Sequence, residues 1–540
     1  MNAKISWTST LIGFVAIAYS SVLSGATFNV ANGDVPGLRN AILSANAMAG
    51  PDTIILAPGG DYPLDSFYLS SSPGDRTGLP WITSEIVIEG QGATIRRADS
   101  IGFPVPYFRI IRMTNTGFLT IRDTLIVKGD LGPGSPDYDA FGASGIQNDG
   151  GSLVVENCNF QKNRSDHWVA AIQSTGPTTV SDSSFSESFT GDAGTAGIRA
   201  TGASSVSIRR CYFFQNNASN TIALNQVPGA EIAGCTLEQC QGTSGEAASG
   251  VGIDASGSTA KVINCTITHS GNSAVSVHDG STVDVRHCTI TENGSIAANH
   301  NGPGIAVTKG SFLRLVNTIV AFNGVAPYSG DCRNDGVFLL NVGNLIRDGS
   351  GSPAFTGDPK LGTLGLYGGG TPVFPLIVGS PAIDHATDAQ SEPVDQRGVA
   401  RPIGLHADIG AYEGSVPDLR GVWRIIVNLI YRTEPYIIVC DPLGGPIYFS
   451  IPGTRSLSVR TINPASLTLG NARAGTARIT GYADVNRDGV EDLQVTFDAA
   501  EVYRGARDCT AVTLLEMQGM TASGQPLVGY INVQAAPSKR

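Results

Sequence analysis

The most regularly spaced metal-ligand residues of the chain lie near its C-terminal end, in the segment Asp484-Val-Asn486-Arg-Asp488-Gly-Val490-Glu-Asp492. Side-chain oxygens at the first, third and fifth positions, a glycine at the sixth and a backbone carbonyl at the seventh match the first half of a calcium-binding loop. Ca²⁺ binds several oxygens at once, and a loop of this kind wraps them around one ion. We therefore expect Asp484, Asn486, Asp488, Val490 and Asp492 to hold a structural calcium ion, the alternative being a solvated acidic turn.

A second group consists of histidines that lie close together in the sequence: His269, His278, His287 and His300. They fall in successive copies of a repeat, and stacked repeats bring residues that are distant in sequence onto one face. With Asp254 and Asp279 nearby, they predict a ligand site, the alternative being histidines scattered over the surface. His287 precedes Cys288 where Arg210 precedes Cys211 in another copy, so we expect its side chain to face solvent.

A third candidate is the turn extension Arg164, Asp166, His167 and Trp168. An indole ring offers a flat apolar face for a sugar ring, and the charged neighbours offer hydrogen bonds to its hydroxyls. This turn is therefore a candidate glycan-binding loop.

The elements that must position these residues are repeats of some two dozen residues between 145 and 323, among them SGIQNDGGSLVVENCNF and VGIDASGSTAKVINCTI. Each copy has an aliphatic anchor, and the anchors recur every 22 to 31 residues: Ile146, Ile172, Ile198, Ile222, Ile253, Val275 and Ile305. A small residue follows each anchor by 11 to 13 residues: Cys158, Ser183, Cys211, Cys235, Cys265, Cys288 and Thr318. Short strands with Gly, Asn and Ser at the corners bury their apolar side chains only by stacking on the next copy. The pattern predicts an all-β chain built on a right-handed parallel β-helix of about ten coils.

The small-residue column is expected to point inward as a ladder of free thiols and hydroxyls. Stacked strands lie roughly 4.8 Å apart, which exceeds the separation of about 3.8 Å between the Cβ atoms of a disulfide. Cys440 and Cys509 lie in the last domain, and whether they pair stays open.

Residues 27–64 are predicted to cap the solenoid with a short helix built on Leu38, Ile42 and Leu43. A helix there covers the exposed strand edges of the first coil. The segment GLRNAI resembles the SLREAI core of the N-terminal module named CSLREA, although the leading cysteine is absent. Residues 82–129 look like two earlier coils, with Thr124 in the small-residue column.

Residues 325–415 carry, in order, GDPKLG, GSPAID, DQRGVARP and DIGAYE. This order resembles the closing region of the exported right-handed β-helix proteins called choice-of-anchor Q, which have the pectate-lyase-like fold. The matching positions are Asp358, Pro359, Leu361 and Gly362, then Ser380 to Asp384, Asp395 to Gly398, Arg401, Pro402 and Asp408 to Glu413. Asp395, Arg397, Arg401, Asp408 and Glu413 predict a charge-paired lock that closes the far end of the solenoid, the alternative being a catalytic set.

Residues 418–540 alternate apolar and polar residues in short runs separated by Gly, Pro and Asn, which predicts a small antiparallel β-sandwich. It holds the calcium loop, which resembles the loops of dockerins and of calcium-binding modules in exported bacterial proteins. The loop departs from an EF-hand, because Val495 stands where the last acidic ligand belongs and a strand-like segment follows. Residues 1–26 read as a signal peptide, with Ser24 and Ala26 at the cleavage positions.

A formal charge of −11 with no basic stripe argues against nucleic-acid binding. Polysaccharide-cleaving enzymes of the resembled fold carry recognisable catalytic motifs, such as GHG and RIK with paired aspartates, or a basic residue among calcium-binding acids. None of these motifs is present in the sequence. The sequence therefore predicts an exported monomer, extracellular or on a bacterial cell surface, with no membrane span after signal removal. It would bind a polysaccharide or a partner protein without catalysis. The alternatives are a divergent polysaccharide lyase or glycoside hydrolase, and a spacer that displays the C-terminal domain.

Overall fold

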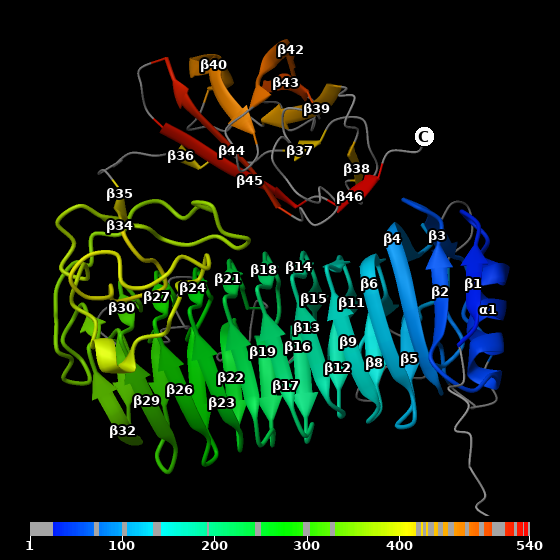
Figure 1. Cartoon of the computed structure of the whole chain (residues 1–540), viewed down its shortest axis with the longest axis horizontal. Helices are drawn as coiled ribbons and strands as arrows, with labels where there is room; N and C mark the ends of the chain where they lie inside the picture. Colours follow the sequence, from blue (N-terminus) through cyan, green and yellow to red (C-terminus); the bar gives the residue numbers. More distant parts are fainter. Residues whose placement is uncertain are drawn as a thin grey trace, which may run out of the picture.

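The protein is a solenoid of stacked coils followed by a group of mostly antiparallel strands (Figure 1). The computed structural model describes residues 25–69, 75–99, 105–132, 142–191, 194–242, 250–294, 303–324 and 330–416, and between 423 and 537 the strands named below with a few adjoining residues. The strands of the solenoid pair in parallel from coil to coil, which confirms the predicted β-helix.

One side of the solenoid is a sheet of nine strands in the described part of the chain, called here the nine-stranded sheet. Its members are β5 (Ile111–Met113), β8 (Ile146–Asn148), β12 (Ile172–Ser174), β16 (Thr195–Thr201), β19 (Asn220–Asn225), β22 (Val251–Ser256), β25 (Val275–His278), β28 (Ile305–Val307) and β31 (Cys332–Asn334). The seven predicted anchors are direct partners across it, and all of them are buried. The variable spacing in the sequence is therefore absorbed entirely by loops.

Two further arrays complete each coil. The first array consists of β9 (Ser152–Glu156), β13 (Thr178–Ser181), β17 (Val206–Arg209), β20 (Ala230–Ala233), β23 (Thr259–Ile263), β26 (Thr282–Arg286), β29 (Phe312–Val316) and β32 (Val337–Val342). The second array consists of β10 (Asn159–Gln161), β14 (Ser184–Ser186), β18 (Tyr212–Phe214), β21 (Thr236–Glu238), β24 (Thr266–Thr268), β27 (Thr289–Thr291), β30 (Ile319–Ala321) and β33 (Leu345–Ile346). A short sheet of β7 (Asp130–Leu131), β11 (Arg164–Ser165) and β15 (Phe189–Thr190) follows the second array in three of the coils.

The corner between the first and second arrays explains the small-residue column. The residue before each column member, such as Asn157, Arg210 or Asn264, has a positive φ, between 46° and 67°, which turns the chain sharply inward. The column side chain is then buried and accepts a hydrogen bond from the backbone N–H of the preceding coil. Examples are Cys158 N to Ser183 Oγ at 3.0 Å and Cys265 N to Cys288 Sγ at 3.4 Å. The column therefore needs a small acceptor, and its cysteines are free, as predicted.

A second inward ladder, at the corner that follows the second array, escaped the sequence analysis. Asn163, Asn216, Asn293 and Asn323 recur there and are buried. Asn163, for example, accepts from Gly129 N at 3.0 Å and donates to Ile126 O at 3.0 Å. These amides satisfy the backbone groups that the corner leaves unpaired.

The N-terminal end is capped as predicted. Helix α1 (Val35–Ala47) begins at Asp34, whose carboxylate accepts from Gly37 N, and buries Leu38 and Ile42 against the first coil, although Leu43 is largely exposed. The first strands are β1 (Thr27–Val30), β2 (Asp52–Leu56), β3 (Asp61–Leu64), β4 (Glu85–Arg97) and β6 (Phe118–Val127). The long strands β4 and β6 are the two predicted early coils, and Thr124 is buried in register with Ala93.

The closing segment, defined as residues 358–414, forms the predicted charge pairs but not at the predicted place. Arg397 Nη2 lies 2.6 Å from Asp395 Oδ2, and Arg401 Nη1 lies 2.6 Å from Glu413 Oε2. The segment lies beside the ends of β24, β27 and β30 (Figure 1). On the outer side of the second array, Gln396 Oε1 accepts from Thr266 Oγ1 at 2.7 Å. Threonine hydroxyls on that side provide its hydrogen bonds, so the segment covers the flank of several coils and does not simply close the end.

Beyond the closing segment, small sheets confirm the predicted antiparallel domain. Among the described residues, β36 (Trp423–Arg424), β45 (Pro526–Asn532), β44 (Leu514–Thr521), β40 (Ile462–Leu469) and β41 (Gly475–Thr476) form one sheet. A second sheet contains β37 (Asn428–Leu429), β39 (Pro446–Ile451), β43 (Asp492–Asp498) and β42 (Arg478–Ala483). Two edge pairings are parallel: β36 with β45, and β38 (Ile437–Cys440) with β46 (Gln534–Pro537). The side chains of Phe449 and Phe497 meet in the core of this domain at 5.8 Å between ring centroids.

The remaining short elements are β34 (Leu376–Ile377), β35 (Ser415–Val416), η1 (Asp388–Gln390) and η2 (Val459–Thr461). In the described part of the chain no helix is long and apolar enough to cross a membrane.

Candidate functional site

The candidate site lies on the outer side of the nine-stranded sheet. The residue after each anchor points outward, because neighbouring side chains of a strand alternate between the two faces. Five of these residues pair across adjacent strands and are called here the outward row: Gln147, Gln173, Arg199, Ala223 and Asp254. Four of the five are polar, but Ala223 separates Arg199 from Asp254, and Gln147, Gln173 and Ala223 are buried. The partly exposed polar groups of the row are therefore Arg199 and Asp254.

Arg199 is the central group of the outward row. Its Cζ lies 5.9 Å from the centroid of the Trp168 ring, within the range of a cation–π contact. No carboxylate of the described residues lies within ion-pair distance of its guanidinium. Partial burial lowers the pKa of Arg199, while the charge of Asp254 acts in the opposite sense. A guanidinium that is partly desolvated and lacks an ion pair favours an anionic or strongly hydrogen-bonding ligand.

The two glutamines beside Arg199 differ in their bonding. Gln147 accepts from Ala143 N at 2.9 Å and donates to Asp149 Oδ1 at 2.7 Å. The Gln173 side chain forms no hydrogen bond with the residues that the structure describes, and its amide atoms are not fully buried, although the residue is only 6% exposed. The Gln173 amide is therefore a second polar group beside Arg199 that a ligand can contact.

His278 and Asp254 continue the polar surface beyond Ala223. His278 Nε2 lies 2.9 Å from Asp254 Oδ1, and its Nδ1 lies 2.8 Å from Asp279 Oδ2. The hydrogen bond to Asp254, more than the smaller contribution of Asp279, raises the pKa of His278 to about 9. The imidazole is therefore protonated at neutral pH, and the structure brings this histidine to the same face as Trp168.

Replacing His278 by Gln is expected to remove a pH-dependent part of the stability. Because the pKa of the folded state is raised, the contribution is complete below the unfolded value near 6.5 and is lost as the pH rises through about 9. We expect it to be roughly 1 kcal/mol, since solvent screens a partly exposed pair. Thermal unfolding of both proteins between pH 6 and 10 measures it; parallel curves across that range would contradict the pairing.

A carboxyl group near the predicted sugar-binding turn has an unusual environment. Asp130 on β7 is the direct partner of Arg164 on β11, and Arg97 Nη1 lies 3.8 Å from Asp130 Oδ2. Among the residues that the structure describes, its buried Oδ1 has no hydrogen-bond partner. Burial raises the pKa of Asp130 to about 6 against the opposing charges of Arg97 and Arg164, and Asp166 raises it further.

Asp130→Asn is accordingly expected to stabilise the protein at pH 7.5 by about 1–3 kcal/mol. The raised pKa means that folding opposes ionisation of Asp130. The loss of stability caused by the ionised carboxylate is therefore absent below pH 4 and complete above pH 6. The gain should therefore vanish at pH 4. Thermal unfolding at both pH values tests this, with Asp335→Asn at an exposed ion pair as the control; a variant that is less stable at pH 7.5 would contradict it.

The predicted turn extension is ordered around one ion pair. Arg164 Nη2 lies 2.8 Å from Asp166 Oδ1, and Trp168 N donates to Ser165 Oγ at 3.2 Å. His167 lies between Asp166 and Trp168 in the described segment that joins β11 to β12. The extension thus carries the Trp168 ring to Arg199 on the nine-stranded sheet.

The histidines do not form a single site. His269 lies at the corner after the second array, with Nε2 3.1 Å from Glu292 Oε2, well apart in the coil from His278 on the nine-stranded sheet. His300 lies outside the described residues. The expectation that His287 faces solvent is wrong: it is fully buried under the closing segment, and its Nε2 accepts from Asn317 Nδ2 at 3.0 Å. Burial, with the charge of Arg401, lowers the pKa of His287 well below its usual value.

The predicted calcium ligands fall largely outside the described residues, which is where Asn486, Asp488 and Val490 lie. Asp484 follows β42 and Asp492 begins β43, and these two strands pair antiparallel with Ala483 opposite Asp492. The loop therefore joins two strands of a hairpin. Among the residues described, no group of three or more His, Cys, Asp or Glu residues is placed to hold a metal ion.

Sequence reasoning missed Arg199, Gln173 and Asp130. The signal for the first two was present, because Gln173 and Arg199 directly follow the anchors Ile172 and Ile198. Extending the anchor register by one residue would have placed both outward. Nothing in the sequence indicated that Asp130 would be desolvated.

Comparison with known families agrees with the architecture. Residues 144–323 match the family model described as a right handed beta helix region. No curated protein matches the chain. Strands of the nine-stranded sheet, the first array and the second array all pair in parallel from coil to coil. The segment 144–323 is therefore a right-handed parallel β-helix region.

Proposed function

We propose that the protein is exported and binds a polysaccharide, without cleaving it, along the outward row of the nine-stranded sheet. The observation that carries this proposal is the guanidinium of Arg199, which lies beside the Trp168 ring and forms no ion pair with the described residues, with the amide of Gln173 on the neighbouring strand. An aromatic face stacks on a sugar ring, while a guanidinium and an amide bond its hydroxyl or carboxylate oxygens.

The repetition of the fold supports a linear, repeating ligand. Neighbouring members of the outward row are about 4.8 Å apart, so several strands can contact one extended chain. The predicted signal peptide supports export, to the medium or to a bacterial cell surface. A partner protein on that surface is the other ligand class that an elongated face suits.

A divergent polysaccharide lyase or hydrolase is the second candidate, and Asp130 favours it. A carboxyl group whose pKa is about 6 can donate a proton near neutral pH, which is the property of a general acid. It lies opposite Arg164, close in the coil to the proposed glycan surface.

The test is to incubate residues 27–540 with a panel of acidic and neutral polysaccharides, with calcium and then with a chelator. Retention on a polymer without new reducing ends or unsaturated uronates supports binding. Product that disappears in Asp130→Asn supports the enzyme instead. If the protein is neither retained nor forms product, the result favours the third hypothesis, a spacer that displays the C-terminal domain. In that case, deletion of residues 418–540 should remove the function.

We also propose that the loop from Asp484 to Asp492 binds Ca²⁺ in a structural role. The pattern of oxygen-bearing residues supports it, and the paired ends of β42 and β43 would hold such a loop closed. The comparison of calcium with chelator in the same panel shows whether the ion affects retention.

A further inference from the structure

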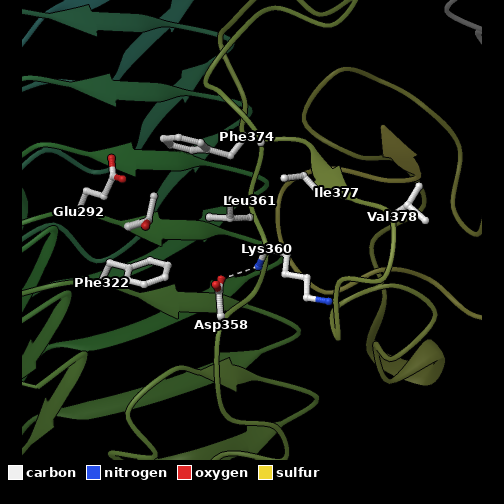
Figure 2. A pocket seen from close by; sticks show the side chains of 10 residues that line it. Glu292, Phe322, Asp358, Lys360, Leu361, Phe374, Ile377 and Val378 are labelled. Carbon is white, nitrogen blue, oxygen red and sulfur yellow. Dashed lines mark hydrogen bonds between the residues drawn. The ribbon is translucent and has the colours of Figure 1, made fainter. Parts of the chain in front are cut away.

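A cavity separate from the outward row lies between the solenoid and the closing segment (Figure 2). It has a volume of about 370 Å³. The solenoid provides residues from β27 and from the turns after β27 and β30, and the closing segment provides the rest. Its lining is Thr291, Glu292, Phe322, Asp358, Lys360, Leu361, Gly362, Phe374, Ile377 and Val378.

Two aromatic rings flank the cavity. Figure 2 shows Phe374 and Phe322 on either side of Leu361, with Glu292 on the same side of the cavity as Phe322. Arg347 Cζ already lies 4.6 Å from the centroid of the Phe322 ring. Since the faces of a phenyl ring attract cations, a positive group between the two rings would be favoured.

The polar groups of the cavity are acidic on balance. Glu292 and Asp358 contribute two carboxylates, while the Nζ of Lys360 is held by the carbonyl of Gly379 at 2.9 Å. Glu292 uses Oε2 for His269, and its Oε1 has no partner among the described residues. A carboxylate oxygen is therefore available beside the aromatic rings.

Thr291 contributes a hydroxyl group to the lining of the cavity. The residue is 1% exposed, and its Oγ1 is not a fully buried atom without a partner. It therefore adds a polar contact to the cavity without being an unsatisfied group.

We propose that this cavity binds a small organic cation, an ammonium group carried by an apolar body. The ammonium contacts Glu292 and the faces of Phe322 and Phe374, and the apolar body packs on Leu361 and Ile377. This site does not depend on the proposed polysaccharide surface, which lies on a different side of the coil.

The probes are benzyltrimethylammonium, choline and the neutral carbon isostere of choline, in which a quaternary carbon replaces the nitrogen. Calorimetry on residues 27–540 should show millimolar or tighter binding of both cations and binding of the isostere weaker by about tenfold. Equal affinity for choline and its isostere, or no binding of either cation, overturns the proposal.

Glu292→Gln is the decisive variant, expected to weaken the binding of both cations by about tenfold. It should fold, because Gln215 and Gln239 occupy the same corner position with the same positive φ in earlier coils. Glu187→Gln is the matched control, since Glu187 holds that corner position with a φ of 53°, away from the cavity. Unchanged cation affinity in Glu292→Gln, or equal loss in Glu187→Gln, overturns the assignment.

Discussion

Arg401→Met is expected to destabilise the closing segment by about 3–5 kcal/mol, because it leaves a buried carboxylate without its cation. Arg401 and Glu413 are 1% and 0% exposed, and their ion pair is 2.6 Å long. Arg401 also donates to the carbonyls of Asp408 and Gly410, at 3.0 and 2.8 Å. Methionine fills much of the volume of the arginine stem, so the loss reports the charge and its hydrogen bonds more than a cavity.

Hydrogen exchange is the appropriate measurement, since a solenoid can lose one part without global unfolding. Amides between 382 and 414 should exchange faster by two or more orders of magnitude, while those of β8 and β12 should not change. Arg333→Met, at an exposed pair with Asp335, should have no measurable effect. Equal protection of the closing segment in Arg401→Met and the wild type would contradict its role as a lock.

Phe185→Ala is expected to cost about 3–5 kcal/mol, the cost typical of removing a buried aromatic ring. Phe160, Phe185 and Phe213 occupy equivalent positions of β10, β14 and β18 and are fully buried. Their rings stack at 4.9 and 4.7 Å between centroids, nearly parallel. The middle ring supports both neighbours, so its loss opens a cavity between three coils.

Chemical denaturation monitored by circular dichroism would measure the free energy of unfolding. Phe185→Leu is expected to lose less than half as much stability as Phe185→Ala. Phe118→Ala is the control, because that ring is 54% exposed. A cost below about 1 kcal/mol for Phe185→Ala would mean that the coils collapse onto the gap and that the ladder is not a rigid stack.

The coil architecture was predictable because each coil repeats the same local choices. The anchors from Ile146 to Ile305 pair directly across the nine-stranded sheet. The cysteine column was predicted to be inward, small and unbonded, and the corner geometry explains it: a positive φ at Asn157 or Asn264 turns the next side chain into the core. The spacing from anchor to column varies only between 11 and 13 residues because one turn and one strand of the first array separate them in every coil.

The contacts of the closing segment could not be read in the same way. Gln396 meets Thr266 across 130 residues of sequence, and no repeat encodes that pairing. His287 shows the consequence, since its corner position does face away from the solenoid core but the closing segment covers it. The aromatic neighbour of Arg199 depends likewise on a loop conformation that the sequence of one coil does not specify.

The proposal that the outward row binds polysaccharide is tested most directly by the affinity of Arg199→Gln for whichever polymer the wild type retains. Gln173 occupies the equivalent position of the neighbouring strand, so glutamine is compatible with the fold at residue 199. The control is Arg209→Gln, at an ion pair with Glu231 on the first array.

We predict that Arg199→Gln weakens binding by about tenfold or more in affinity electrophoresis, and that Arg209→Gln leaves it unchanged. Equal retention of all three proteins, or retention of no polymer by the wild type, would contradict a polysaccharide-binding face on the nine-stranded sheet.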